Sequence, residues 1–140
     1  MLKIILDTNV IIAARRSRNG ASFQLVSMIG KGQFELIMSV ALALEYEYVL
    51  NEQFADVGMD KADISDFVSF LCANSLRYEV KLSGWPITAD LGDEFIARLA
   101  LTSGCDFLVT HNIRHLGAVT DLGIKLVTPK QFLPIIRNQS

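Results

Sequence analysis

Short apolar runs separated by longer helical patterns limit the folds open to this chain more than any other feature of its sequence. Three runs, at residues 3–7, 34–39 and 106–110, are too short for typical helices and apolar enough to be strands buried on both faces. Residues 125–128 form a weaker strand pattern. Residues 77–82 are a fifth candidate, because apolar and polar residues alternate there.

Helical patterns occupy the segments between these runs. They cover residues 22–30, 40–52, 61–76, 93–103 and 130–136. Glycines 30, 32 and 104 mark helix ends, and Asp60 is the expected N-cap of the third helix. Strands that alternate with helices predict right-handed β–α–β crossovers and a mainly parallel sheet of four or five strands. We therefore predict a three-layer α/β/α fold.

The size and composition of the chain favour a single domain over residues 1–140. The chain has 140 residues, 51% of them hydrophobic, which is enough to bury a core and too few for two full domains. No apolar stretch approaches the roughly 20 residues of a membrane span. The first residues have the pattern of a strand and not of an export signal. We expect a soluble cytoplasmic protein with no membrane contact.

Charge and cysteine content argue against two kinds of function. The formal net charge is −2, so binding of nucleic acid would need a local basic patch or metal ions and not a generally basic surface. Cys72 and Cys105 lack the close spacing of a thiolate metal site, and each lies in an apolar segment. We expect both to be reduced cysteines in the core.

Polar residues stand where the predicted core strands end. Asp7 and Ser39 follow the first two strands, and Thr110, His111 and Asn112 follow the third. In open parallel sheets, ligand sites form outside the carboxyl ends of the strands. The sequence therefore predicts a functional site at this edge.

Four acidic residues can reach the same edge, although each also has an ordinary structural explanation. Asp7 would serve as a helix N-cap. Glu45 falls on a mostly apolar side of the second predicted helix, where a carboxylate is costly unless it is paired, bound to metal or placed at a hydrated rim. Asp90 and Asp93 precede and begin the fourth predicted helix, where caps and dipole partners are common.

Convergence of these acids points to a metal ion. Like charges repel, and the usual reason to bring three carboxylates together is a hard divalent cation with oxygen ligands. We predict that the carboxyl groups of Asp7, Glu45 and Asp93 lie within about 4 to 8 Å of one another. Asn112 is expected beside them and Asp90 at the rim.

Four segments resemble, in order and spacing, the motifs of PIN domains. They are residues 6–10 (Leu-Asp-Thr-Asn-Val), 39–45, 93–100 and 108–112 (Leu-Val-Thr-His-Asn). The similarity covers nearly the whole chain and is greatest to PIN proteins described as toxin components of toxin–antitoxin systems, relatives of the VapC-type toxins. This resemblance implies a ribonuclease that depends on Mg²⁺ or Mn²⁺, acts on RNA and has an antitoxin as a possible protein partner.

The resemblance also implies roles for single residues. Asp7, Glu45 and Asp93 match the three main acidic positions, and Asp90 matches an additional acid, so these four would hold the metal. Asn112 completes the implied catalytic set with the first three. The family commonly has Asp at that position, and Asn keeps an oxygen ligand but loses its charge. Such a loss weakens a second metal site or makes it depend on substrate phosphate.

Neighbouring polar residues are expected to support this chemistry. With the ion held by Asp7 and Asp93, a coordinated water would attack phosphorus in line, and Glu45 would ligate the ion or orient that water. The residues expected to hold the carboxylates and the backbone in place are Thr8, Asn9 and Thr110.

A basic cluster made of Arg15, Arg16 and Arg18 follows the first motif. Solvated surface charge is the alternative for each of them, but as a group they are the expected contacts to RNA phosphates. Residues that would add to the cluster are Lys31, Arg98 and Arg114. The histidines, His111 and His115, are expected to be surface polar groups outside the catalytic set.

Two other functions remain open from the sequence. A receiver-like or flavodoxin-like domain also places an Asp at a strand end, but this chain has no glycine-rich phosphate loop after the first strand. A PIN fold that no longer cleaves would act as an RNA-binding or protein-interaction module. In either PIN case a homodimer is expected, with Phe67, Phe70 and Leu71 as interface residues or, alternatively, as part of the core.

Overall fold

The computed structural model describes residues 1–54, 59–81, 84, 86–88 and 91–139, and the side chains of all these residues except 91 and 92. The described residues form a five-stranded sheet in the order β3-β2-β1-β4-β5, and every pairing in it is parallel. The strands are β1 (Lys3–Leu6), β2 (Glu35–Met38), β3 (Ser75–Arg77), β4 (Phe107–Val109) and β5 (Lys125–Val127). The predicted α/β fold with a mainly parallel sheet is confirmed.

The helices connect these strands and follow the last one. Within the described residues they are α1 (Thr8–Arg16), α2 (Ala21–Ser27), α3 (Val40–Phe54), α4 (Lys61–Ala73), α5 (Leu91–Ser103), α6 (Gly117–Thr120) and α7 (Pro129–Arg137). The predicted N-cap of α4 is confirmed, because Asp60 Oδ1 accepts from the backbone N–H of Asp63 at 2.8 Å. Gly104 ends α5 with φ +61°, a conformation that favours glycine.

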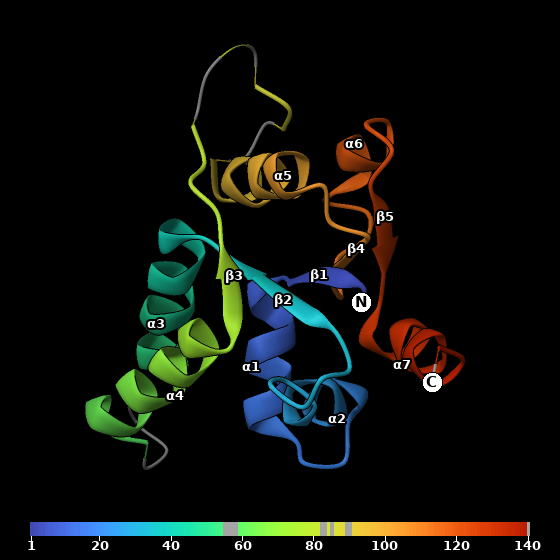
Figure 1. Ribbon diagram of the computed structural model, residues 1–140. Coiled ribbons are helices and arrows are strands. Elements are labelled where there is room, and N and C mark those ends of the chain that lie inside the picture. The colour runs from blue at the N-terminus through green and yellow to red at the C-terminus, as the bar shows by residue number, and fades with distance from the viewer. Residues whose placement is uncertain (55–58, 82–83, 85, 89–90, 140) are drawn as a thin grey trace.

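The direction of each crossover assigns the helices to two layers. The chain passes from β1 to β2 and from β2 to β3 toward the same edge of the sheet, so right-handed crossovers place α1 to α4 on one face. The return from β3 to β4 runs the opposite way and places α5 on the other face. Figure 1 shows α5 and α6 on one side of the sheet, and α1 to α4 with α7 on the other. The three predicted layers are therefore present.

The fifth predicted strand is in the wrong place. Residues 77–82 were expected to be extended, whereas β3 covers Ser75–Arg77. β3 pairs with β2, and that pairing stops where Met38 ends β2 and the chain turns into α3. The last bond of this edge joins the N–H of Tyr78 to the Met38 carbonyl at 2.9 Å. Alternation beyond Tyr78 has no neighbouring strand to pair with; Leu82 lies outside the described residues.

The end of α4 also differs from the prediction. The helical pattern at residues 61–76 predicts a helix through Leu76, but α4 ends at Ala73 with Asn74 as its C-cap. The Asn74 side chain donates from Nδ2 to the Phe70 carbonyl at 2.9 Å and so satisfies one of the last carbonyls of the helix. The next three residues form β3, because pairing with β2 competes with one more helical turn.

Two helices, α1 and α6, are not among the predicted ones. α6 has four residues, which is too short for a periodic pattern. α1 contains the β-branched run Val10, Ile11 and Ile12, a composition that disfavours helix. All three side chains are buried, so packing against the sheet outweighs their intrinsic preference.

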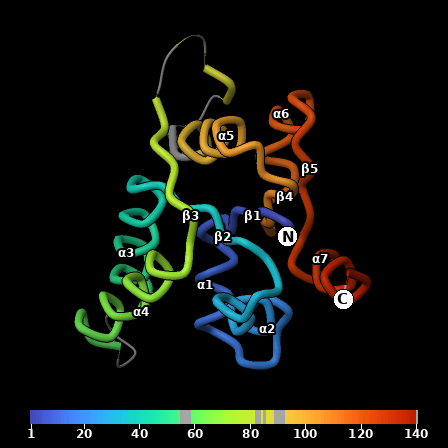
Figure 2. Tube along the Cα trace, in the orientation of Figure 1, coloured from blue at the N-terminus to red at the C-terminus, as the bar shows by residue number. Residues whose placement is uncertain are grey.

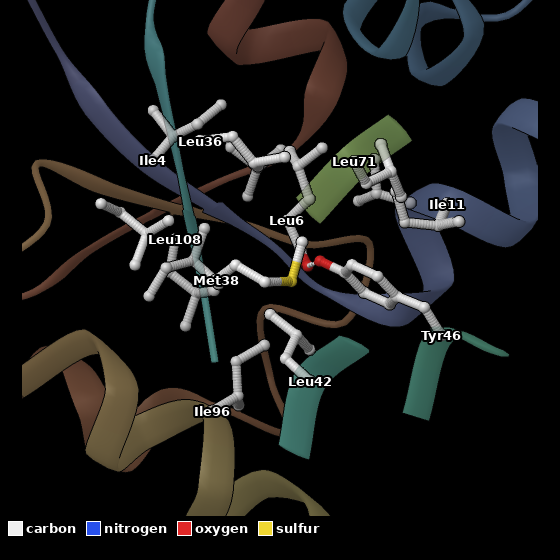
Figure 3. Packing of buried hydrophobic residues seen from close by; sticks show 14 of the residues in the cluster. Ile4, Leu6, Ile11, Leu36, Met38, Leu42, Tyr46, Leu71, Ile96 and Leu108 are labelled. Carbon is white, nitrogen blue, oxygen red and sulfur yellow. Dashed lines mark hydrogen bonds between the residues drawn. The ribbon is translucent and has the colours of Figure 1, made fainter. Parts of the chain in front are cut away.

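The core lies on both faces of the central strands. Ile4, Ile5 and Leu6 are completely buried, and so are Leu108 and Val109 of the neighbouring strand. Figure 3 shows Leu6, Met38 and Leu108 packed with side chains of α1, α3, α4 and α5. This confirms the prediction of strands buried on both faces. Burial and parallel pairing together hold the carboxyl ends of β1 and β4 in register.

The two cysteines differ in their burial. Both cysteines are free, but only Cys105 is buried, and Cys72 is exposed on the outer side of α4. The expectation of a core position is therefore wrong for Cys72.

The three residues of α4 that were expected at an interface or in the core differ in exposure. Leu71 is completely buried and belongs to the core, while Phe70 is 45% exposed and Phe67 is partly buried. Leu71 therefore takes the second of the two roles expected of it, that of a core residue, and the homodimer stays a prediction.

None of the helices found in the described residues is long and apolar enough to cross a membrane.

The tube in Figure 2 shows how three segments that are far apart in the chain come together. The end of β1, the start of α3 and α5 lie near one another. This neighbourhood is where the acidic residues of interest lie.

Candidate active site

Asp7 stands at the point where the strand order of the sheet reverses. The connection after β1 leads to β2 on one side of it, whereas β4 lies on the other side of β1. Open α/β sheets bind ligands at such a reversal of strand order. The backbone N–H of Asp7 donates to the Val109 carbonyl at 2.9 Å, so the residue still belongs to the β1–β4 ladder. Its side chain is therefore fixed relative to the end of β4.

The Asp7 carboxylate caps α1 and also accepts bonds from the site. Oδ1 accepts from the Thr8 N–H at 2.8 Å. Oδ2 accepts from Thr110 Oγ1 at 2.7 Å and from Asn9 Nδ2 at 3.2 Å. Asp7 is thus the N-cap of α1, as its structural explanation predicted, and one of its carboxylate oxygens also faces Thr110 and Asn9; its role in metal binding stays a prediction.

Burial raises the pKa of Asp7 above its ordinary value of 3.8. Hydrogen bonds from Thr110, Thr8 and Asn9, and the nearby His111, act in the opposite direction but do not cancel this effect. A carboxylate in this position is costly to ionise without further positive charge. A bound cation would supply that charge.

Glu45 is brought to Asp7 by α3 and by one hydroxyl group. The Ser39 hydroxyl accepts from the Leu42 N–H at 3.1 Å and starts α3 directly after β2. One turn later, the half-buried Glu45 accepts a hydrogen bond at Oε2 from Thr8 Oγ1. Because the Thr8 N–H donates to Asp7, the two carboxylates share one small polar neighbour.

Tyr46 ties the start of α3 to the end of β1. Its side chain is completely buried, and its hydroxyl donates to the Leu6 carbonyl (Figure 3). Burial raises the pKa of Tyr46 well above its ordinary value, and the negative charges of Asp7 and Glu45 add to the shift. Sequence analysis did not single out this residue, since an aromatic residue on a helix is ordinarily a core residue.

The segment after β4 completes the polar cluster. Thr110 is completely buried, and its hydroxyl oxygen accepts from Asn9 Nδ2 at 3.3 Å and from the Asn112 N–H at 3.0 Å. Asn9 Oδ1 accepts from the His111 N–H at 3.1 Å. Thr8, Asn9 and Thr110 therefore donate hydrogen bonds to the carboxylates of Asp7 and Glu45, while their role in catalysis stays a prediction. Asn112 follows directly and is exposed.

The His111 ring lies against α2. Its Nε2 is 2.8 Å from the hydroxyl oxygen of Ser22, which is itself buried. The backbone of the same residue is bonded to Asn9. His111 thus links α2 to the loop that carries Thr110 and Asn112, although the residue as a whole is exposed.

Asp93 lies in the first turn of α5 and is half-buried. The following turn of α5 faces Glu45, because Phe95 and Ile96 line a hollow of about 400 Å³ together with Glu45 and the start of α3. Asp90, the additional acid, lies outside the described residues.

Glu94 is a buried acid that the sequence reasoning missed. Its Oε1 accepts from the N–H groups of Ile87 and Thr88 at 2.7 and 2.8 Å, and its Oε2 accepts from Arg98 Nε at 2.8 Å. The hydrogen bond from Arg98 is the main reason that the pKa of Glu94 is lowered. The spacing of Glu94 and Arg98, four residues apart on a helix, was the available signal for an ion pair.

The donor chemistry near Asp7 fits a hard divalent cation. The two carboxylates and the hydroxyl groups of Thr8 and Thr110 offer oxygen atoms, the ligands that Mg²⁺ and Mn²⁺ prefer. Over the described ranges, however, no three histidine, cysteine, aspartate or glutamate side chains are grouped to hold a metal ion. The convergence of Asp93 with Asp7 and Glu45 therefore stays a prediction.

The arginine cluster lies at the far end of α1 from Asp7, roughly 12 Å away at a helical rise of about 1.5 Å per residue. The Arg15 guanidinium stacks 4.8 Å from the centre of the Phe67 ring, and Arg16 donates to Gln53. Arg15, Arg16 and Arg18 are exposed, and their contact with RNA stays a prediction. Of the added candidates, Arg98 is paired with Glu94.

Comparison with known proteins identifies a family and a fold. The family model of the PIN domain matches residues 3–114. A chain of VapBC-1 from nontypeable Haemophilus influenzae has 18% sequence identity and a TM-score of 0.63, over 92% of this chain and 99% of that one. A chain of VapBC2 from Rickettsia felis, solved bound to a DNA fragment from their promoter, has 14% identity and a TM-score of 0.59, over 89% and 97%. The curated proteins give no match.

Proposed function

Because this chain belongs to the PIN domain family, we propose that it is a metal-dependent ribonuclease and the toxin of a toxin–antitoxin pair. PIN domains are generally nucleases. The finer parts of the proposal, which are the metal, the RNA substrate and the protein partner, rest on the chemistry of the site and on the similarity to VapBC structures.

One observation carries the proposal. Asp7 and Glu45, which come from different parts of the chain, are both bonded to Thr8 at the strand-order reversal of the sheet, Asp7 to its backbone N–H and Glu45 to its hydroxyl group. Burial makes the Asp7 carboxylate costly to ionise, and Glu45 brings a second negative charge to the same neighbouring residue, which a purely structural role does not explain. A cation between or beside them removes this cost and explains the arrangement.

The chain's own residues would divide the work as follows. Asp7 and Glu45 would hold Mg²⁺ or Mn²⁺, with Asp93, Asp90 and Asn112 as further ligands. When bound, the ion supplies Lewis-acid activation of water and of the scissile phosphate. Thr110, Asn9 and Thr8 keep the two carboxylates in place by the hydrogen bonds already described.

Hydrolysis also requires water to be placed in line with the bond that breaks. Glu45 would orient the attacking water and accept its proton, while the water oxygen bonds to phosphorus and the ribose oxygen leaves. Glu45 suits this role because Thr8 fixes one carboxylate oxygen and the residue borders the hollow beside α5. The exposed Asn112 offers an amide oxygen at the rim and no charge, so we propose a single tightly held ion.

The partner is proposed from the structural neighbours. Both are VapBC structures, and one contains a DNA fragment from the promoter. We propose that this chain likewise binds an antitoxin protein, acts on RNA in the cytoplasm and forms a homodimer. A copurification of the chain with the product of the neighbouring reading frame would test the first of these points.

Cleavage of single-stranded RNA tests the proposed activity. The purified protein should cut RNA in Mn²⁺ or Mg²⁺ and not in EDTA, and Asp7→Asn should lower the rate by at least about a hundredfold. Asn is also a good N-cap, so this variant keeps the start of α1. A matched control is Asp60→Asn, which changes an N-cap on α4 in the same way but should cleave like the wild type. Metal-independent cleavage, or equal rates for Asp7→Asn, would contradict the proposal.

A further inference from the structure

A continuous groove runs from Glu45 along the start of α3 toward the edge strand. Its first part is the hollow of about 400 Å³ that Glu45 shares with Leu42 and Phe95. Its second part, of about 530 Å³, has Phe95 and Leu44 in common with the first and continues past the end of β3, from Arg77 to Lys81. Phe95 therefore stands in the wall of both parts, and we call the whole the α3–α5 groove.

The two ends of this groove differ in charge. The first part is bounded by the carboxylate of Glu45. In the second part, Arg77 and Lys81 contribute exposed cationic side chains, with Glu79 between them in sequence and Tyr78 beside them. The walls between the ends are mainly apolar. Cations, an aromatic ring and apolar walls in one groove are the features with which proteins bind single-stranded nucleic acid.

We propose that the α3–α5 groove binds the single-stranded RNA segment next to the scissile phosphate, with a base stacked on Phe95 and phosphates contacted by Arg77 and Lys81. This inference rests on the proposed ribonuclease function and names where its substrate lies. It moves the main phosphate contacts from the arginines of α1 to the edge strand.

Charge and continuity favour RNA as the occupant. The formal net charge of the chain is −2, so a polyanion must meet a local group of cations. Arg77 and Lys81 lie in a groove that also contains Glu45, whereas Arg15 and Arg16 contact Phe67 and Gln53 at the other end of α1. An RNA strand in the α3–α5 groove passes directly by the Glu45 carboxylate.

A protein occupant is the competing explanation. Val40, Leu44 and Tyr48 are spaced four residues apart on α3 and are 58%, 61% and 66% exposed. Such a stripe suits a second copy of the chain or another protein. The test below therefore measures RNA binding and association state on the same variants.

The first arm measures binding without cleavage. Fluorescein-labelled single-stranded RNA is titrated with Asp7→Asn protein in Mg²⁺, and Phe95→Leu is added to this background. Leucine keeps an apolar wall but no planar ring, so Kd should rise at least about fivefold, while Phe95→Trp should bind at least as tightly as the parent. Phe70→Leu is the matched control, since Phe70 is an exposed aromatic on α4 and its replacement should leave Kd unchanged.

The second arm measures charge. The double variant Arg77→Ala and Lys81→Ala should bind more weakly and lower the slope of log Kd against log salt by about 0.7 for each RNA phosphate that is no longer neutralised. The pair Arg15→Ala and Arg18→Ala should change that slope less. If the α1 pair has the larger effect, the RNA runs over α1 and the proposal is wrong.

The third arm separates RNA from protein. Sedimentation of the same variants shows whether Phe95→Leu or the edge-strand pair changes the association state. A change in association with unaltered RNA affinity would assign the groove to a protein and overturn the proposal. Should the wild type fail to cleave while Asp7→Asn still binds RNA through Phe95, the proposed catalysis fails and the groove assignment stands.

Discussion

At the scale of single residues, the site depends on contacts that hold β1, α1 and α3 together. Backbone pairing between β1 and β2 reaches only Ile4 and Leu36. Two residues later, the Leu6 carbonyl points toward the side where that pairing has ended, and the Tyr46 hydroxyl donates to it. One hydrogen bond thus satisfies a buried carbonyl and fixes α3, which carries Glu45, against the strand that ends at Asp7.

Removing this hydroxyl should weaken both the fold and the site. Tyr46→Phe leaves the ring in place and the Leu6 carbonyl without its donor, which should cost about 1–3 kcal/mol in the free energy of unfolding. Urea unfolding measures this change. Tyr48→Phe is the control, since Tyr48 is 66% exposed on the same helix and should change stability by less than about 0.5 kcal/mol. Equal stabilities for the two variants would show that the Tyr46 bond contributes little.

Sequence reasoning found the residues of the site that follow strand ends and missed those defined by packing. Asp7 and Thr110 could be predicted because parallel strands bring their carboxyl ends to one edge. Glu45 was predicted from its helical spacing relative to apolar neighbours. Tyr46 and Phe95 carry no such signal, because their roles depend on which backbone or hollow their rings meet.

At the scale of the elements, the sequence predicted the central strands and erred at the edge. β1, β2 and β4 are buried on both faces except at their first residues, and the residues after the first are apolar in each. β3 lies at the edge with two of its three residues exposed, so its pattern is weak and its position depends on where β2 ends. α1 was not predicted, because tertiary packing overrides the propensity of its β-branched residues.

The connection between Glu94 and residues 87–88 is a contact between elements that should depend on pH. The folded-state pKa of Glu94 lies below its ordinary value of 4.5, mainly through the hydrogen bond from Arg98. The folded form then binds fewer protons than the unfolded form, so this contribution to stability is present above pH 4.5 and disappears as pH falls through the folded pKa.

Glu94→Gln should therefore be less stable than the wild type near pH 7, with a difference that shrinks as the pH falls below 4.5. Glutamine keeps an acceptor for the N–H groups of Ile87 and Thr88 but no charge for Arg98. Urea unfolding at a series of pH values measures the difference. The exposed Glu52→Gln serves as the control, and a Glu94→Gln difference that is constant over pH would rule out the charge as its cause.

At the scale of the whole molecule, topology decides where the acids meet, and the metal decides whether they are tolerated. The order β3-β2-β1-β4-β5 places the ends of β1 and β4 side by side, with α3 and α5 converging from opposite faces. The alternation of strands and helices in the sequence was enough to predict a parallel sheet with its polar residues at one edge, but not this strand order. The distance from Asp93 to the other carboxylates could not be predicted either, because it depends on how α5 is seated against α3.

Metal binding should therefore appear as stability of the whole fold. A ligand that binds only the folded state at 100 times its Kd adds about 2.7 kcal/mol, so Mn²⁺ should raise the Tm of the wild type by several degrees over its value in EDTA. Asp93→Asn should reduce this gain and abolish cleavage, and in EDTA it should be equally or more stable, because one of the mutually repelling charges is gone.

The exchange of Asn112 for Asp should act in the opposite direction. Asn112→Asp adds a charged oxygen ligand after β4, so it should increase the gain in Tm from Mn²⁺, raise the cleavage rate and lower the Tm in EDTA. Calorimetry of the wild type and both variants, each with and without Mn²⁺, gives the six Tm values needed. A structural role for Asp93 as a helix cap predicts the reverse in EDTA, a destabilisation of about 1 kcal/mol for Asp93→Asn with no change in the effect of Mn²⁺. That result would remove Asp93 from the proposed metal site and leave Asp7 and Glu45, which both accept hydrogen bonds from Thr8, as its remaining described carboxylates.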